Sequence, residues 1–402
     1  MSEFTRRSFL GIAATAAGSF AALQKVVGAG HPSDPGPANQ TLDGQNPDSA
    51  WPPGTDSKSL VQNFKYPFSF ANKRVYEGGW SREVTVRELP VSKTLAGVNM
   101  RLTAGGFREL HWHTASEWAI MLYGSARLTA IDLDGKSFVA DVNKNDLWFF
   151  PPGIPHSIQG LNPDGCEFML VFDDGNFSES ETVLLSDAMA HLAPEVLSKN
   201  FGVGENAFAN LPRQELFIFQ ADVPGSLEAD QKVAAGTRGR SPQNLAFRTM
   251  EMLPTLKTKG GEVRIVDSSN FKVSTTAMAL VTVHPGGLRE LHWHPNADEW
   301  QYYISGKGRM TVVDTGNKAR TMDFQEGDVG YVQKTLLHYV ENTGDSDLVF
   351  LEMFGKVARF QDLSFSEWLA HTPPEAVMAH LHIDKATFDA LPKNGGVVMP
   401  LS

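Results

Sequence analysis

The sequence predicts an all-β protein with two tandem jelly-roll β-barrels and short flanking helices. The first observation is a repeat, because GGFRELHWHTASEWAIMLYG at 105–124 returns as GGLRELHWHPNADEWQYYISG at 286–306. The second is that the segments around each copy are short, rich in β-branched residues and ended by glycine or proline, as strands are. Many short strands with regularly spaced turns, present twice, favour two closed barrels. A helical pattern ends each copy, LLSDAMAHLAPEVLSKNFGV in the first and LSFSEWLAHTPPEAVMAHLHI in the second.

The N-terminus has the pattern of a twin-arginine export signal. Arg6 and Arg7 precede an apolar stretch that ends in small residues, as at a cleavage site. The stretch is short for a spanning helix and rich in alanine and glycine. We therefore expect residues 1–29 to be removed, leaving a periplasmic or secreted protein without membrane contact. Residues 30–60 are rich in proline, glycine and aspartate and predict a flexible arm.

Two barrel domains are expected after the arm, one over residues 61–235 and one over 236–402. In the first, ARLTAIDLDGKSFVADV predicts a hairpin that turns at its Asp-Gly pair. The helical pattern that ends each domain contains a serine near its start, Ser186 or Ser364, and both are candidate N-caps or turn starters.

The composition excludes two classes of property. The formal net charge is −11 and the chain has no basic block, so nucleic acid is not an expected partner. Cys166 is the only cysteine, which rules out an intrachain disulfide.

Each copy carries four side chains that can bind a metal ion, and the two sets are 181 or 182 residues apart. His-x-His on a strand places both imidazoles on one face, and a glutamate beyond the next turn and a later histidine can reach the same point. Three nitrogens and one carboxylate leave two octahedral positions open, which suits Mn, Fe, Co, Ni or Zn, whereas closed structural zinc sites favour thiolates. The expected ligands are His111, His113, Glu117 and His156 in the first copy, and His292, His294, Glu299 and His338 in the second.

With these residues the chain resembles the cupin superfamily. Both copies match its first motif, G-x5-H-x-H-x3,4-E-x6-G. Both match the second, G-x5-P-x-G-x2-H-x3-N, in part, and the departures lie in turns while the histidines remain. The phrases RELHWH, DLWFFP, FDDGNFSE and GDVGYV resemble more narrowly the bicupin oxalate decarboxylases, over roughly residues 60–385.

This resemblance implies a manganese-dependent oxalate decarboxylase that converts oxalate to formate and carbon dioxide. It implies two Mn²⁺ ions per chain, dioxygen as a cofactor and a homo-oligomer, a trimer or a hexamer. Arg108 and Arg289 fall on the arginine that grips the substrate carboxylate, a task that suits a bidentate guanidinium. Glu179 falls on the proton donor of a mobile lid in the first domain, and Glu352 on a glutamate late in the second barrel.

Two details of the sequence bear on the roles that the resemblance assigns to Arg108 and Glu179. Strict strand alternation would turn Arg108 away from His111, three residues later, so a twist or bulge must intervene. The lid reads SESET at 178–182 where the family has SENST, which makes Glu181 a second candidate for proton delivery. The alternatives are an oxalate oxidase that releases hydrogen peroxide, a bicupin dioxygenase for a ring substrate, and a non-catalytic metal-binding bicupin.

Overall fold

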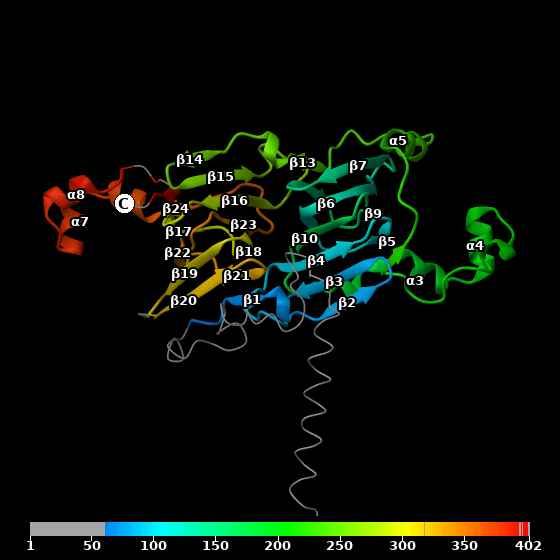
Figure 1. Ribbon diagram of the computed structural model, residues 1–402, viewed down its shortest axis with the longest axis horizontal. Helices are drawn as coiled ribbons and strands as arrows, with labels where there is room; N and C mark the ends of the chain where they lie inside the picture. The colour runs from blue at the N-terminus through cyan, green and yellow to red at the C-terminus, as the bar shows by residue number, and fades with distance from the viewer. Residues whose placement is uncertain (1–60, 317, 394, 396, 401–402) are drawn as a thin grey trace, which may run out of the picture. The chain divides into compact units, whose positions relative to one another are not determined.

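The computed structural model describes residues 61–400 except 317, 394 and 396. The export signal predicted at 1–29 and the arm predicted at 30–60 lie outside the described residues. Strands dominate the described part, in two barrel-like groups with short helices after each group (Figure 1). The predicted all-β fold class is confirmed.

One long strand organises the first barrel by belonging to both of its faces. The first half of β6 (Glu117–Ile131) pairs with β8 and β10, and the second half pairs with β7 and β9. The change of partners occurs near Gly124, which has φ +70° and whose missing Cβ would lie 2.0 Å from the Gly165 carbonyl oxygen. The predicted hairpin is confirmed as β6–β7. The other strands of this sheet are β2 (Lys73–Tyr76), β3 (Gly79–Val84), β4 (Ala96–Leu102), β5 (Gly106–Trp112), β7 (Ser137–Asn143), β8 (Asp146–Phe150), β9 (His156–Gly160), β10 (Cys166–Phe172), β11 (Val183–Leu184), β12 (Ile218–Gln220) and β13 (Ala246–Arg248).

The second barrel repeats this plan with the long strand divided in two. Gly306, at φ +85°, separates β18 (Glu299–Ser305) from β19 (Lys307–Asp314). One sheet has the order β1-β21-β18-β23-β16-β15-β14 and the other β20-β19-β22-β17-β24, with β25 beside β17. These strands are β1 (Lys65–Pro67), β14 (Leu256–Thr258), β15 (Gly261–Val266), β16 (Ala277–Val283), β17 (Leu288–Trp293), β20 (Lys318–Gln325), β21 (Asp328–Val332), β22 (Leu337–Asn342), β23 (Leu348–Phe354), β24 (Leu363–Ser364) and β25 (Val398–Met399).

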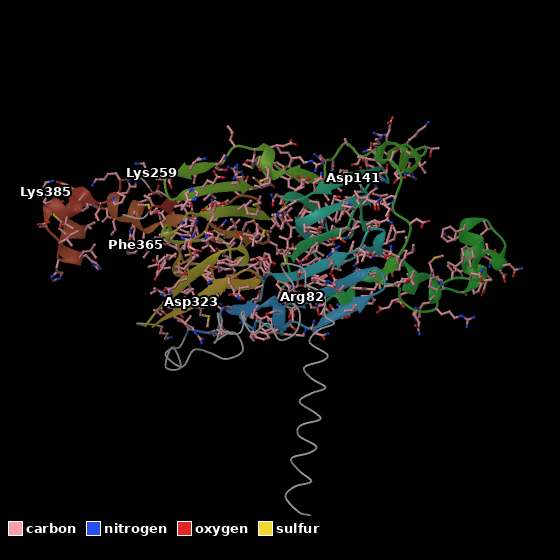
Figure 2. The ribbon with its side chains drawn as sticks, in the orientation of Figure 1. Arg82, Asp141, Lys259, Asp323, Phe365 and Lys385 are labelled. Carbon is pink, nitrogen blue, oxygen red and sulfur yellow. The ribbon has the colours of Figure 1, made fainter. Side chains whose placement is uncertain are left out.

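The outer hairpins of the two barrels carry matching charged pairs. Arg127 on β6 binds Asp141, its cross-strand partner on β7, at 2.8 Å. Arg309 on β19 binds Asp323, its cross-strand partner on β20, at 2.7 Å. Asp141 and Asp323 are labelled on these strands in Figure 2. Facing opposite charges of this kind support the register of an antiparallel pair.

The two predicted domains, 61–235 and 236–402, exchange edge strands. β1, near the start of the first, pairs with β21 of the second barrel, and β13, within the second, pairs with β8 of the first barrel. The ion pair between Lys65 and Asp328, 3.2 Å long and nearly inaccessible to solvent, fixes β1 in this position. The barrels are therefore held together by backbone pairing as well as by packing.

Alternation along β6 divides its side chains between two apolar clusters. Trp118 and Ile120 belong to a cluster that also contains Trp300 of β18, whereas Ala119 and Met121 belong to a cluster inside the first barrel. All four residues are at most 1% exposed. Because both faces of the strand are buried, its sequence here is a continuous apolar run and does not alternate between apolar and polar residues.

Short helices follow each barrel, and only one of the two predicted serine caps is correct. Ser364 caps α6 by accepting a hydrogen bond from the backbone N–H of Glu367. Ser186 lies inside α3 and caps nothing, because Glu109 binds its side chain and its backbone N–H. Within residues 61–400, as far as they are described, no helix is long and apolar enough to span a bilayer. The α-helices are α3 (Leu185–Ala190), α4 (Pro194–Phe201), α5 (Leu227–Ala235), α6 (Phe365–Ala370), α7 (Pro374–Leu381) and α8 (Lys385–Ala390).

Candidate metal centres and their arginine–glutamate neighbours

The ends of three strands bring the first set of metal-capable side chains together. His111 lies near the end of β5 and His113 one residue beyond it, while Glu117 begins β6 and His156 begins β9. His111 and His156 are direct cross-strand partners. The candidate ligand atoms of all four residues lie within 4.8 Å of one another, and all four side chains are buried.

Backbone carbonyls orient the imidazoles of this cluster. The Nδ1–H groups of His111, His113 and His156 donate to the carbonyl oxygens of Glu109, Ala115 and Ile154 at 2.6, 2.8 and 2.7 Å. This bond fixes the tautomer and leaves the Nε2 lone pair free for a metal. Burial lowers the pKa of His111 and of His156, so both are held neutral, the form that binds a metal.

The carboxylate of Glu117 completes the cluster. Its Oε2 lies 3.3 Å from Nε2 of His113 and 3.3 Å from Nε2 of His156, and its Oε1 accepts a hydrogen bond from Trp148 Nε1 at 3.0 Å. Burial acts to raise the pKa of Glu117, but the neighbouring imidazoles of His156 and His113 outweigh it and lower the pKa. Three imidazole nitrogens and one carboxylate thus face one point, a donor set suited to a divalent first-row metal.

The second cluster has the same construction. The Nδ1–H groups of His292, His294 and His338 donate to the carbonyl oxygens of Glu290, Gln361 and Leu336. Glu299 Oε2 lies 2.7 Å from Nε2 of His338 and 3.1 Å from Nε2 of His294. The Oε1 atom of Glu299 accepts a hydrogen bond from Gln301 Nε2 at 2.6 Å. Gln301 thus takes the role that Trp148 has beside Glu117 in the first barrel. The ligand atoms of this set also lie within 4.8 Å of one another.

A β-bulge places an arginine beside each cluster, as the odd spacing required. On β5, Arg108 pairs with Ile158 and His111 with His156, so three steps on one strand match two on the other. The same shift occurs on β17 between Arg289 and His292. Of the twist or bulge expected between Arg108 and His111, the structure has a bulge, and the second barrel has an equivalent one.

In the first barrel this arginine has one carboxyl neighbour, supplied by the lid segment (residues 178–182). Arg108 Nη2 lies 3.5 Å from Glu179 Oε2, and each side chain is 2% exposed. Arg108 Nη1 donates to the Phe217 carbonyl at 3.4 Å, and its guanidinium lies 4.0 Å from the centroid of the Phe217 ring. Neither Arg108 Nη2 nor Glu179 Oε2 has a hydrogen-bond partner among the described residues. Buried polar atoms without partners indicate a place for a polar ligand.

The electrostatic environment of Glu179 suits a group that holds a proton. Burial raises its pKa, and the opposing charges of Arg108 and Arg74 do not cancel the effect. Glu181, two residues later, is exposed, and no ion pair joins its carboxylate to another residue of the described part of the chain. The structure therefore separates the two lid carboxylates, and only Glu179 points into the first barrel.

In the second barrel the arginine has two carboxylate partners. Arg289 Nε donates to Glu352 Oε1 at 3.1 Å and Nη2 donates to Asp362 Oδ2 at 3.0 Å. Burial acts to lower the pKa of Arg289, but Glu352 and Asp362 outweigh it and raise the pKa. Burial raises the pKa of Glu352 against the effect of Arg289. The same motif thus produces an arginine with one carboxyl neighbour at 3.5 Å in the first barrel and an arginine with two closer carboxylate partners in the second, where Arg289 Nη1 also has no hydrogen-bond partner among the described residues.

Sequence reasoning missed Asp362 and a buried glutamate that anchors each ligand strand. Glu109 accepts hydrogen bonds from Ser186 and from the backbone N–H groups of Leu216 and Phe217. Glu290, its equivalent, accepts from Ser364 and from the backbone N–H of Val397. Both are the glutamate of an RELHWH phrase, so the repeat carried a signal for them.

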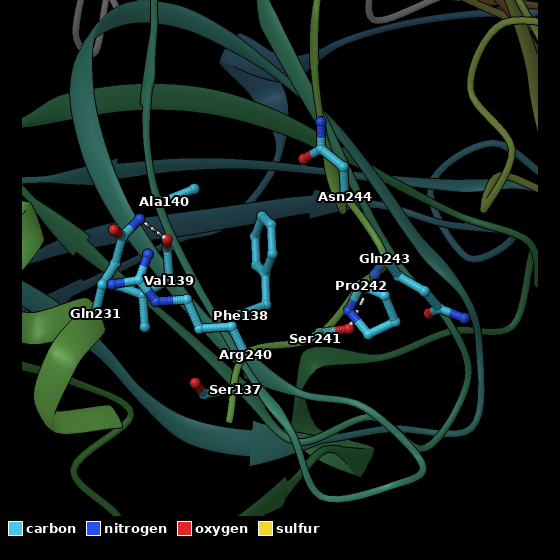
Figure 3. Close-up of a pocket in the computed structure, with 10 residues that line it drawn as sticks. All are labelled: Ser137, Phe138, Val139, Ala140, Gln231, Arg240, Ser241, Pro242, Gln243 and Asn244. Carbon is cyan, nitrogen blue, oxygen red and sulfur yellow. Dashed lines mark hydrogen bonds between the residues drawn. The ribbon is translucent and has the colours of Figure 1, made fainter. Parts of the chain in front are cut away.

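A pocket of about 300 Å³ lies apart from both clusters, between β7 and the chain that leads to β13 (Figure 3). None of the eight candidate ligands lines it, and Arg240 is its one charged side chain. Its lining consists of Ser137, Phe138, Val139, Ala140, Gln231, Arg240, Ser241, Pro242, Gln243 and Asn244.

Known proteins share this double construction. The model of the cupin family matches the chain twice, over residues 68–208 and 247–389. The chain is 53% identical over 358 residues to oxalate decarboxylase OxdC of Bacillus subtilis, covering 89% of this chain and 91% of that protein. It is 37% identical to a probable oxalate decarboxylase of Arthroderma benhamiae, covering 89% and 88%. A solved structure of the Bacillus subtilis oxalate decarboxylase, from work on its Mn(II) centres, superposes with a TM-score of 0.84 at 52% identity, covering 90% of this chain and 95% of that one.

Proposed function

Because this chain belongs to the cupin family and, within it, to the oxalate decarboxylases, we propose that it converts oxalate to formate and carbon dioxide with manganese. The observation that carries the proposal is the first barrel's combination of a complete ligand set, an arginine with unused donors and a buried lid carboxyl. Oxalate needs all three, because it is a small dianion that must be held at both ends and protonated at carbon.

The residues of both clusters fit a resident manganese ion. The buried Nε2 atoms of His156, His292 and His294 have no hydrogen-bond partner among the described residues, although each ring donates from Nδ1 to a carbonyl. The donor set contains no thiolate, and imidazole with carboxylate is compatible with manganese. Bound manganese would supply a Lewis acid for one oxalate carboxylate and a one-electron redox centre. We propose that two ions bind per chain, with dioxygen as a cofactor that is not consumed.

The chain's own residues would orient oxalate and move one proton. Arg108 binds the carboxylate that the cluster does not hold, through Nη2, which has no hydrogen-bond partner among the described residues and only a long contact, 3.5 Å, to Glu179. Glu179 receives one proton, from hydrogen oxalate or from solvent when oxalate binds as the dianion, and delivers it to the carbon that has lost carbon dioxide. The balance is HC₂O₄⁻ → HCO₂⁻ + CO₂, and with the oxalate dianion one proton is taken up. Closure of the lid excludes water from this transfer, consistent with the near-complete burial of Glu179.

We propose that the first barrel performs the turnover. A dianion that enters the second site must compete with Glu352 and Asp362 for the same guanidinium. The dianion would also meet the negative charge of these two carboxylates, and like charges repel strongly where the surroundings are buried. Glu352 forms an ion pair with Arg289 there, and the catalytic roles expected of both residues stay predictions.

The experiment that tests the function compares products. Manganese-loaded protein is given oxalate in the presence and absence of dioxygen, and oxalate, formate, carbon dioxide and peroxide are measured. We expect about one formate per oxalate, with turnover that needs dioxygen but does not consume it. Peroxide without formate would identify an oxalate oxidase, C₂O₄²⁻ + O₂ + 2H⁺ → 2CO₂ + H₂O₂. No oxalate consumption would leave a non-catalytic metal-binding protein, an alternative that two complete ligand sets disfavour.

We also propose export through the twin-arginine system. The pattern around Arg6 and Arg7 supports it, as does a physical reason. The affinity of a nitrogen and oxygen site for divalent metals rises from manganese to copper. A protein that folds around manganese before export therefore avoids competition from copper and zinc outside the cytoplasm. The double change Arg6→Lys, Arg7→Lys should abolish export in a fractionation experiment, and unchanged periplasmic activity would contradict the proposal.

We propose a homo-oligomer, a trimer or a hexamer. Apolar side chains of the helices after the barrels support it, because Val196, Phe201 and Trp368 are 49%, 55% and 57% exposed in the single chain. Light scattering with size-exclusion chromatography tests it, and a monomer at micromolar concentration would contradict it.

A further inference from the structure

The lid segment makes few contacts of its own that could hold it closed. It forms a single 3-10 turn, η3 (Glu179–Glu181), after Ser178. Within it, Ser178 accepts from the backbone N–H of Ser180 at 3.2 Å, and the backbone N–H of Glu181 donates to the Ser178 carbonyl at 2.9 Å. One short turn cannot fix the direction of a buried carboxyl, so the closed position must depend on contacts with the barrel.

Two side chains of the first hairpin provide such contacts. Glu83 Oε2, on β3, accepts the backbone N–H of Glu179 at 3.1 Å. Arg74 Nη1, on β2, donates to the hydroxyl of Ser180 at 3.2 Å. Arg74 Nη2 also lies 3.7 Å from Glu83 Oε2, so the two side chains support each other. Successive lid residues are therefore held by one charged pair.

The hairpin that carries this pair is anchored on the barrel. β2 pairs with β3 and β3 with β4 in a continuous antiparallel ladder. The Arg74 guanidinium lies 5.0 Å from the centroid of the Phe217 ring, the ring that also contacts Arg108. After the lid, β11 pairs with β5, with Leu184 opposite His111. One end of the lid is thus fixed to the ligand strand, while its Glu179–Ser180 step depends on Arg74 and Glu83.

We propose that Glu83 and Arg74 form a latch that holds the lid closed over the first metal cluster and so commits the enzyme to formate. This inference rests on the proposed function and adds two positioning residues to it. When the latch is closed, the Glu179 carboxyl stays beside Arg108 and its proton reaches carbon. When the latch opens, the proton donor leaves the site, and oxalate is instead oxidised to two molecules of carbon dioxide while dioxygen accepts two electrons and two protons as peroxide.

The test combines product ratios with a measurement of lid opening. Glu83→Ala removes the acceptor of the Glu179 N–H, and Arg74→Ala removes the donor to Ser180. Glu83→Gln keeps an acceptor oxygen and should rescue part of the effect. In the manganese-loaded protein, Glu83→Ala and Arg74→Ala should each raise the peroxide-to-formate ratio by about tenfold or more, because each removes a charge-assisted hydrogen bond that favours the closed state. Hydrogen exchange of residues 179–182, followed by mass spectrometry, should accelerate by a similar factor.

Arg87→Ala is the matched control. Arg87 binds the other oxygen of the same carboxylate, Glu83 Oε1, at 2.5 Å, but it is more than half exposed and does not touch the lid. It should leave both the product ratio and lid exchange at wild-type values. A merely structural role of Glu83 in the hairpin would affect all of these variants through stability and metal content, without a change of product.

Ser180→Ala keeps the test decisive if a hairpin variant fails to fold. Ser180 is exposed, and the change removes only the lid acceptor of Arg74. It should move the product ratio and the exchange rate in the same direction as Arg74→Ala, by a smaller factor. Wild-type product ratios and wild-type lid exchange in Glu83→Ala, or in Ser180→Ala where Glu83→Ala does not fold, would overturn the latch. Absence of formate from the wild-type enzyme would instead overturn the proposed function, and lid exchange would still test the latch.

Discussion

Replacing each of the two equivalent arginines with lysine should give two different results. In Arg108→Lys the guanidinium fork that faces the first cluster becomes a point charge. Its partners are Glu179 at 3.5 Å and the Phe217 carbonyl at 3.4 Å, both long contacts, so the fold loses little. The loss should fall on oxalate, because a lysine cannot bind a carboxylate in a bidentate manner.

The magnitude follows from the hydrogen bonds that each lysine is unable to make. One charge-assisted hydrogen bond is worth about 1.5–3 kcal/mol, so kcat/KM for oxalate should fall roughly 10- to 150-fold. In Arg289→Lys the bonds at stake are those to Glu352 and Asp362, at 3.1 and 3.0 Å. A lysine can bind one of the two carboxylates. The free energy of unfolding should therefore fall by an amount near the lower end of the range for a broken buried ion pair, about 3 kcal/mol. For a domain of this size that is roughly 6–12 °C in Tm.

The assay pairs steady-state kinetics with calorimetry and elemental analysis. We expect Arg108→Lys to keep manganese and Tm while losing turnover, and Arg289→Lys to keep turnover per folded molecule while losing Tm. Neither arginine is a ligand, so both variants should bind manganese at the wild-type ratio. If Arg108→Lys turns over oxalate like the wild type while Arg289→Lys does not, the second barrel is the working site and the reasoning from charge balance is wrong.

Three further outcomes can be checked with the same protein. Metal content should approach two manganese ions per chain, and His113→Ala and His294→Ala should each remove about one by elemental analysis; a wild-type ratio near one would show that one cluster is not a metal site. Glu179→Ala should abolish most formate production and direct residual oxalate consumption to peroxide, whereas Glu181→Ala, which alters an exposed carboxylate, should change the yield little; the reverse pattern would transfer the role to Glu181. Burial raises the pKa of Glu179 and the protonated form is the donor, so formate production should be complete below that pKa and fall as pH rises through it; a rate that rises over that range would contradict the assignment.

The sequence predicted the fold and the ligands because both depend on local, repeated patterns. Strand alternation places His111 and His113 on one face of the chain, and the second copy repeats the arrangement. The Asp-Gly pair specified the β6–β7 turn for the same reason, since Gly135 adopts φ +72° there. Even the bulge between Arg108 and His111 could be anticipated from an odd spacing.

What could not be predicted depends on segments far apart in the chain. Asp362 binds Arg289 across 73 residues, and no spacing rule connects them. Glu83 meets the Glu179 backbone across 96 residues. Ser186 failed as a helix cap because Glu109, 77 residues earlier, binds its hydroxyl. Local capping propensity predicts poorly where a buried carboxylate from a distant segment accepts the hydrogen bonds of the predicted cap.

The duplication suggests why only one barrel needs a lid. Both sites place an arginine next to a carboxyl group whose pKa burial raises. In the second barrel that carboxyl, Glu352, lies on β23, a strand paired on both sides, and cannot leave the site. In the first it is Glu179, on a single turn held by the barrel through two side chains. A proton donor that takes its proton from bulk solvent whenever the oxalate dianion binds has to alternate between a dry and an open position, and only the first arrangement permits both. In the second arrangement the arginine is held between Glu352 and Asp362, which is why we propose that turnover belongs to the first barrel.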